Sequence, residues 1–291
     1  YEKLLEEFPE ASVVPLAHYN AGLAYERLED WPEAVDHFET IVHEHPGSEP
    51  HVDAHFNLAR AYGKVENWEG VADTFWQVRQ LDADLSPMDE LEARVGTSVG
   101  LFMQDDFASA EKQLLSTLRF FEEHPQKEYL PAGYFVAQAR FYLGEIEARA
   151  FERVELTPPT GTPGDGWAEL MGDELEKKCD RLLRAQARFI RTIRVGHEGW
   201  ATAAGFRIGS MYERLFDELL ELPVPPDLSE EAAEIYREEL RERVSVLVKK
   251  AIRVYESNRE MAERVGAENA WVEKTTAALE RMKKLYLATA E

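Results

Sequence analysis

Apolar positions along the chain recur at the three- and four-residue spacing of amphipathic helices, and these helical segments come in pairs. Residues 21–28 and 208–215 share one sequence pattern, in which a small residue is followed three positions later by an aromatic one. The aromatic residue of the first copy is Tyr25. A turn with a polar and an aromatic residue follows, as in Asp30-Trp31, and a second helical segment comes after it. The pattern predicts an all-α chain built from helix–turn–helix units.

The order of small, aromatic, turn, small, aromatic and proline positions resembles the tetratricopeptide repeat (TPR), a helix pair of about 34 residues. Residues 15–48 match this order at almost every position, residues 52–85 match it well, and residues 91–125 match it in part. The resemblance implies a right-handed superhelical solenoid of antiparallel helix pairs, in which the small residues let the two helices of a repeat approach closely. The matching residues of the first segment are Gly22, Tyr25, Ala34, Phe38, Ile41 and Pro46.

We expect these repeats to form one continuous solenoid with irregular long helices and a capping helix at its C-terminus. The Pro- and Gly-rich stretch 157–166 cannot continue a helix and is predicted to be an inserted loop. Tyr1 and Pro9 fall where the second helix of a repeat would place them, so we expect the native protein to continue upstream. The predicted parts are residues 1–9 (second helix of a truncated repeat), 15–125 (three TPR-like repeats), 131–220 (divergent repeats with the loop) and 229–291 (a long helix plus the capping helix).

Charge narrows the range of partners. The chain carries 33 basic and 56 acidic side chains, a net charge of −23. A field of this sign repels nucleic acid and anionic membrane surfaces, and no apolar run approaches the roughly 18 residues that span a bilayer. We therefore expect neither nucleic-acid binding nor direct membrane insertion. Cys179 is the only cysteine, which excludes an intrachain disulfide and a cysteine-based metal site.

No constellation of catalytic residues stands out in the sequence. It contains no Gly-rich phosphate loop, no nucleophile elbow and no zinc-protease motif. We therefore expect no enzymatic activity and no cofactor. His51 and His55 have the i, i+4 spacing of metal ligands on one helix face, and the alternative is a plain surface cluster together with His43 and His45.

The resemblance also implies a binding groove, because the first helices of stacked tetratricopeptide repeats line a concave face. Four repeats place an aromatic residue at one common position of this face and a basic residue eight positions later. We predict that this strip binds a protein or peptide segment, either an acidic one or a free C-terminus. The alternative is that the aromatics only pack and the basic residues only pair with glutamates. The predicted groove residues are Tyr19, Asn20, Arg27, Phe56, Asn57, Arg60, Lys64, Phe141, Arg149, Phe206 and Arg214.

These features favour a non-catalytic protein–protein interaction scaffold within a multiprotein assembly. Two alternatives stay open: a structural or self-associating spacer module, and a regulatory domain of a longer enzyme. The C-terminal portion, with Trp200, Tyr212 and Trp271, also resembles TPR proteins of Gram-negative cell envelopes, including those of gliding-motility machinery. That resemblance implies a periplasmic or outer-membrane-associated protein, and the cytoplasm remains the alternative.

Overall fold

A computed structural model describes residues 1–81, 84–156, 165–224 and 228–290. Within these ranges every regular element is a helix, which confirms the prediction of an all-α chain. The chain divides into two compact units, Tyr1–Phe135 and Val136–Glu291. The predicted single continuous solenoid stays a prediction. None of the described helices is long and apolar enough to cross a membrane.

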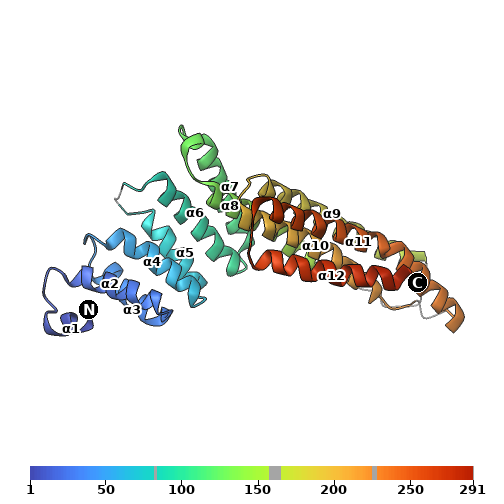
Figure 1. Ribbon diagram of the computed structural model, residues 1–291, viewed down its shortest axis with the longest axis horizontal. Helices are drawn as coiled ribbons and strands as arrows, with labels where there is room; N and C mark the ends of the chain where they lie inside the picture. Colours follow the sequence, from blue (N-terminus) through green and yellow to red (C-terminus); the bar gives the residue numbers. More distant parts are fainter. Residues whose placement is uncertain (82–83, 157–164, 225–227, 291) are drawn as a thin grey trace. The chain divides into compact units, whose positions relative to one another are not determined.

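The first unit is a stack of helix pairs in which each helix packs against the one before and the one after it (Figure 1). This sequential packing is the arrangement of a helical solenoid. A short 3₁₀ turn, Lys127–Tyr129, follows the last of these helices. The helices are α1 (Glu2–Glu7), α2 (Val14–Arg27), α3 (Trp31–Glu44), α4 (His51–Lys64), α5 (Trp68–Val78), α6 (Pro87–Met103) and α7 (Phe107–Glu123).

The turns inside the three helix pairs α2–α3, α4–α5 and α6–α7 repeat one backbone geometry. An acidic residue occupies the left-handed region in each turn, with φ of 58° at Glu29, 58° at Glu66 and 61° at Asp105. In the second and third turns the next residue caps the following helix: the side chains of Asn67 and Asp106 accept hydrogen bonds from backbone N–H groups at 3.0 and 3.1 Å. The repeated polar turn of the sequence is therefore a repeated reversal of the chain.

Glycines sit where paired helices cross most closely. A Cβ atom added to Gly22 would lie 2.6 Å from the ring of Phe38, which comes from the second helix of the same pair. Gly144 stands in the same relation to Phe189, also at 2.6 Å. The small and aromatic positions of the sequence pattern thus mark one structural contact, in which the aromatic ring covers the glycine.

The second unit contains longer helices grouped around α10, which packs against α9, α11 and α12 (Figure 1). Ser229 caps α11, because its hydroxyl accepts a hydrogen bond from the backbone N–H of Ala232 at 3.3 Å. Most of the predicted loop 157–166 lies outside the described residues, and α9 begins at its end. The helices are α8 (Gly133–Glu152), α9 (Asp165–Ile193), α10 (Glu198–Leu220), α11 (Glu230–Val265) and α12 (Ala270–Ala290).

Candidate protein-binding site

The first helices of the repeats in unit 1, α2 and α4, bring two predicted groove residues into contact. The amide of Asn57 donates a hydrogen bond to the hydroxyl oxygen of Tyr19 at 3.2 Å. Burial raises the pKa of the Tyr19 hydroxyl, and the hydrogen bond from Asn57 opposes this rise only in part. Asn20 lies beside them on α2, and its amide donates to the backbone carbonyl of Leu16 at 2.9 Å.

Arg60 extends this polar surface from α4 to α6. Its Nε lies 3.1 Å from a carboxylate oxygen of Glu92, and half of its side chain remains exposed. Burial raises the pKa of Glu26 on α2, and the positive charge of Arg60 acts against this rise. The negative charge of Asp53 adds to the rise in the pKa of the neighbouring Tyr19 hydroxyl. The predicted basic position therefore interacts with carboxylates from two other helices, α2 and α6.

The other predicted basic residues of unit 1 differ in their surroundings. Arg27 is exposed and has no charged partner in the part of the chain that the structure describes. The ammonium group of Lys64 lies 5.3 Å from the ring centroid of Trp31, a cation–π contact between adjacent repeats. Arg27 is thus the more available of the two cations for a partner.

Each of the four aromatic residues predicted for the groove packs against another aromatic ring. Tyr19 and Phe56 meet Phe38 and Phe75 edge-on, with ring centroids 6.0 and 6.1 Å apart. In unit 2, the centroid of Phe141 lies 5.5 Å from that of Phe189, and the centroid of Phe206 lies 6.0 Å from that of Tyr255. Each partner ring belongs to the second helix of the same pair. These contacts favour the packing interpretation for Phe56 and Phe141, whose side chains are buried.

The predicted basic residues of unit 2 are engaged within their own helices. Arg149 lies 3.2 Å from Glu152, and Arg214 lies 2.7 Å from Glu218. Glu218 also forms an ion pair with Lys178, a fully buried lysine on α9, whose Nζ lies 2.6 Å from a carboxylate oxygen of Glu218. A partner's carboxylate would have to compete with these glutamates, so the basic column is less available in unit 2 than at Arg27.

A buried ion-pair network joins α8 to α10, and its central residue was not predicted from the sequence. Arg207 Nε lies 2.5 Å from Glu145, and another guanidinium nitrogen lies 3.1 Å from Glu152. Burial raises the pKa of Glu145 despite Arg207, whereas the hydrogen bond and charge of Arg207 outweigh burial at Glu152 and lower its pKa. Arg207 follows Phe206 directly, as the predicted groove residue Asn57 follows Phe56. This shared repeat position is the sequence feature from which Arg207 could have been predicted.

His51 and His55 lie side by side but are buried against the backbone. Their ring centroids are 4.6 Å apart, and His55 Nδ1 lies 2.8 Å from the carbonyl oxygen of His51. A carbonyl oxygen only accepts, so this nitrogen carries the proton and is not free to bind a metal. Among the described residues, no group of three or more His, Cys, Asp or Glu side chains could hold a metal ion.

The structure instead pairs two histidines that the spacing did not suggest. His18 on α2 and His37 on α3 approach to 2.9 Å between their Nδ1 atoms. The ring of His45 lies nearby, 6.3 Å from that of His18 between centroids. Burial lowers the pKa of both His18 and His37.

The packing above defines a protein of stacked helix pairs, and a family comparison agrees for its first complete pair. Residues 16–48 match the model of the tetratricopeptide repeat. The predicted resemblance is therefore confirmed for α2 and α3. Repeats of this kind generally present extended surfaces that bind proteins. No curated protein matches the chain.

Three solved structures are similar to the chain over most of its length. The MamA protein is 13% identical, with 89% of this chain and 100% of that chain covered and a TM-score of 0.48. A TPR repeats protein from Bacteroides fragilis is 10% identical, with 93% and 98% covered and a TM-score of 0.37. The TPR2AB domain of yeast Sti1, in complex with pHSP90, is 13% identical, with 97% and 100% covered and a TM-score of 0.39.

Proposed function

We propose that this protein is a non-catalytic interaction scaffold that binds an extended segment of another protein on the face formed by α2, α4 and α6. The observation that carries the proposal is the polar surface shared by these helices, on which hydrogen bonds between helices hold Tyr19 to the buried Asn57 and Arg60 to Glu92. Side chains fixed before binding lose less conformational entropy when a partner arrives. The tetratricopeptide match of residues 16–48 supports a role in protein binding.

The charges on this face limit the partner's chemistry. Arg27 offers a cation that no carboxylate of the described residues pairs, and Arg60 offers the exposed half of its side chain. Glu26, Asp53 and Glu92 would repel a run of acidic residues. The face therefore suits a segment with one carboxylate, from an acidic side chain or a free C-terminus, flanked by neutral residues. The multiprotein assembly and a cell-envelope location remain predictions.

A peptide selection tests this proposal. A displayed library of random twelve-residue peptides would be selected on the intact chain, and enriched peptides would be labelled and titrated by fluorescence anisotropy. We expect Arg27→Glu and Arg60→Glu together to weaken binding at least about tenfold, because each reversal replaces an attraction by a repulsion.

Arg119→Glu is the matched control, since it reverses an exposed charge on α7, outside the proposed face. Equal binding by the double variant and the control would contradict the proposal. Light scattering over a range of concentrations tests the self-associating alternative, which requires a mass that grows with concentration.

A further inference from the structure

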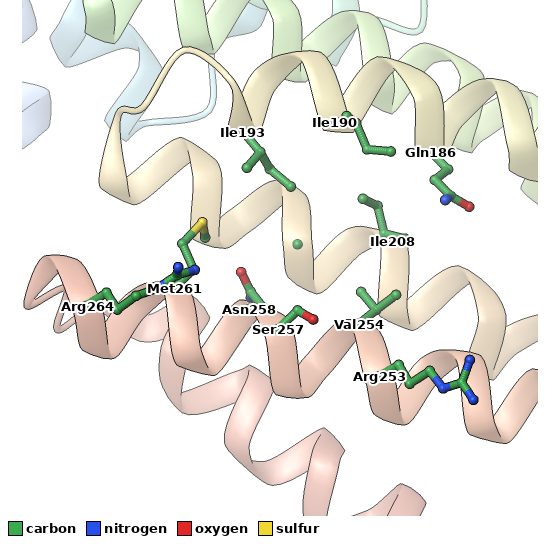
Figure 2. A pocket seen from close by; sticks show the side chains of 11 residues that line it. Gln186, Ile190, Ile193, Ile208, Arg253, Val254, Ser257, Asn258, Met261 and Arg264 are labelled. Atoms are coloured by element: carbon green, nitrogen blue, oxygen red, sulfur yellow. The ribbon is translucent and has the colours of Figure 1, made fainter.

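A cavity of about 390 Å³ lies within unit 2, between α9 and α11 (Figure 2). Its volume lies within the range of small-molecule binding pockets. Ile190 and Ile193 form one wall on α9, and Val254 and Met261 form the other on α11. Figure 2 shows these side chains facing each other across the open space. An apolar group of a partner would be removed from water on both sides here.

The floor of the cavity is polar at one point. Asn258 is 4% exposed, and its Nδ2 donates to the carbonyl oxygen of Thr202 at 3.0 Å and to the hydroxyl of Thr275 at 2.8 Å. The Thr275 hydroxyl itself donates to the carbonyl oxygen of Trp271 at 2.8 Å, so it accepts from Asn258. These two bonds fix which end of the amide carries the nitrogen.

The other end of this amide lacks a donor. Among the described residues, none donates a hydrogen bond to Asn258 Oδ1. A Cβ atom at Gly205 would lie 2.1 Å from this oxygen, so only glycine leaves room for it. A buried carbonyl without a donor is unfavourable, and a ligand that brings one is favoured. Asn258 Oδ1 is covered from solvent, so a ligand's donor reaches it only when a neighbouring side chain moves, and Met261, an adaptable side chain, borders the same space.

Two arginines on α11 line the cavity along its length. Arg253 and Arg264 are exposed, and they are eleven residues apart, about 16 Å along a helix. Neither forms an ion pair with a carboxylate in the described ranges of the chain. In a protein of net charge −23 these cations select acidic groups beside the apolar anchor.

We infer that this cavity is a second protein-binding site, which receives a tryptophan side chain flanked by acidic residues of a partner protein. The indole ring provides a large apolar body for the isoleucine and valine walls, and its single polar group is an N–H donor. That donor matches Asn258 Oδ1, an acceptor of the cavity lining to which none of the described residues donates. Acidic neighbours of the tryptophan reach Arg253 and Arg264.

The site is independent of the face on α2, α4 and α6. It lies in the other compact unit and is lined by the second helices α9 and α11, together with Gly205 and Ile208 of α10. The chemistry also differs, because a buried apolar anchor binds here and a polar extended segment binds there. Either proposal can fail without the other.

The test uses a fluorescein-labelled Glu-Asp-Trp-Asp-Glu peptide and the intact chain in a fluorescence anisotropy titration. A second peptide carries 3-benzothienylalanine, which has the shape of tryptophan but sulfur in place of the indole N–H. We expect the sulfur analogue to bind at least about tenfold more weakly, because Asn258 Oδ1 stays without a donor. Equal affinity of the two peptides, or no binding of the tryptophan peptide at millimolar protein, would overturn the proposal.

Variants locate the site. Val254→Phe fills the cavity and should abolish the difference between the two peptides, whereas Val246→Phe, at an exposed position of α11, should preserve it. Arg27→Glu with Arg60→Glu should leave the tryptophan peptide unaffected. If Val254→Phe fails to fold by circular dichroism, Arg253→Glu with Arg264→Glu replaces it and should weaken the peptide at least about tenfold at low salt. Unchanged binding in the properly folded cavity variant would refute this location.

Discussion

The paired rings of His18 and His37 constrain each other's protonation. Their facing Nδ1 atoms lie 2.9 Å apart, so one nitrogen must donate and the other must accept. Two imidazolium rings would present two N–H groups to each other. Burial lowers the pKa of both rings; the charges of His37 and His45 add to this at His18, and Glu44 opposes it. At His37, the carboxylates of nearby acidic residues oppose the effect of burial.

We expect the folded protein to lose stability as pH falls through the histidine range. A folded-state pKa below 6.5 means that the unfolded chain binds more protons near and below that pH. The stabilising contribution is therefore complete above pH 6.5 and decreases as pH falls towards the lowered pKa. Thermal unfolding at pH 7.5 and 5.5 checks this direction. His37→Gln should reduce the loss, because it removes one of the two titrating rings.

His43→Gln is the control for this prediction, since it removes an exposed histidine from the same helix, α3. An equal pH response in both variants would contradict the role of the pair. Histidine ring resonances followed by NMR would give the two pKa values directly, and values at or above 6.5 would contradict the prediction as well.

Single-residue contacts were the hardest feature to predict from the sequence. The spacing of His51 and His55 suggested a pair, and the structure does bring them together on α4. His18 and His37 are nineteen positions apart, and only the crossing of α2 and α3 joins them. Arg207 was likewise missed, because its partners Glu145 and Glu152 lie on another helix. Sequence spacing shows neighbours on one helix but not which faces meet.

At the scale of helices, the crossing of α10 and α11 shows why the repeat pattern requires a small residue. A Cβ atom at Gly209 would lie 2.3 Å from the ring of Tyr255, and that ring is fully buried. The Tyr255 hydroxyl also donates to Glu213 at 3.0 Å, so the ring cannot move without loss of this bond. Burial is the largest of the effects that raise the Tyr255 pKa far above its ordinary value, and the hydroxyl therefore keeps its proton.

We expect Gly209→Ala to lower the free energy of unfolding by about 1–3 kcal/mol, the usual cost of overpacking in a core. The better helix propensity of alanine, about 1 kcal/mol, offsets part of the strain. Urea unfolding followed by circular dichroism measures the difference. Gly199→Ala on the same helix is the control, because its Cβ would meet only His197 at 3.6 Å. A Gly209→Ala protein as stable as the control would refute the close-packing argument.

The helices themselves were largely predictable from the sequence. The sequence predicted divergent helical repeats at 131–220, and the structure has α8 at Gly133–Glu152 and α10 at Glu198–Leu220 within this range. The sequence did not distinguish the two roles of the predicted groove, since aromatic residues at one repeat position can either bind a partner or pack inside the repeat. The spacing of Phe56 is compatible with both roles. In the structure its ring is buried and meets the ring of Phe75 edge-on, which favours packing.

At the scale of the whole molecule, the dominant electrostatic feature is the excess of acidic groups. The 56 carboxylates outnumber the 33 basic side chains, and many of the basic side chains form ion pairs with nearby carboxylates. On α11, exposed Glu238 and Glu242 are four residues apart, a spacing at which like charges destabilise a helix. Self-repulsion of this kind weakens a compact state at low ionic strength.

We therefore expect sodium chloride to stabilise the folded protein, because with 56 acidic and 33 basic side chains screening weakens more repulsions than attractions. The Debye length falls from about 30 Å at 0.01 M to about 8 Å at 0.15 M salt. Thermal unfolding followed by circular dichroism should show a midpoint about 2–4 °C higher at the greater salt concentration. A variant with Glu238→Gln and Glu242→Gln should unfold at a higher temperature than the parent at low salt and respond less to added salt. A midpoint that falls with salt would instead show that the ion pairs, Arg207 with Glu145 among them, outweigh the surplus of negative charge.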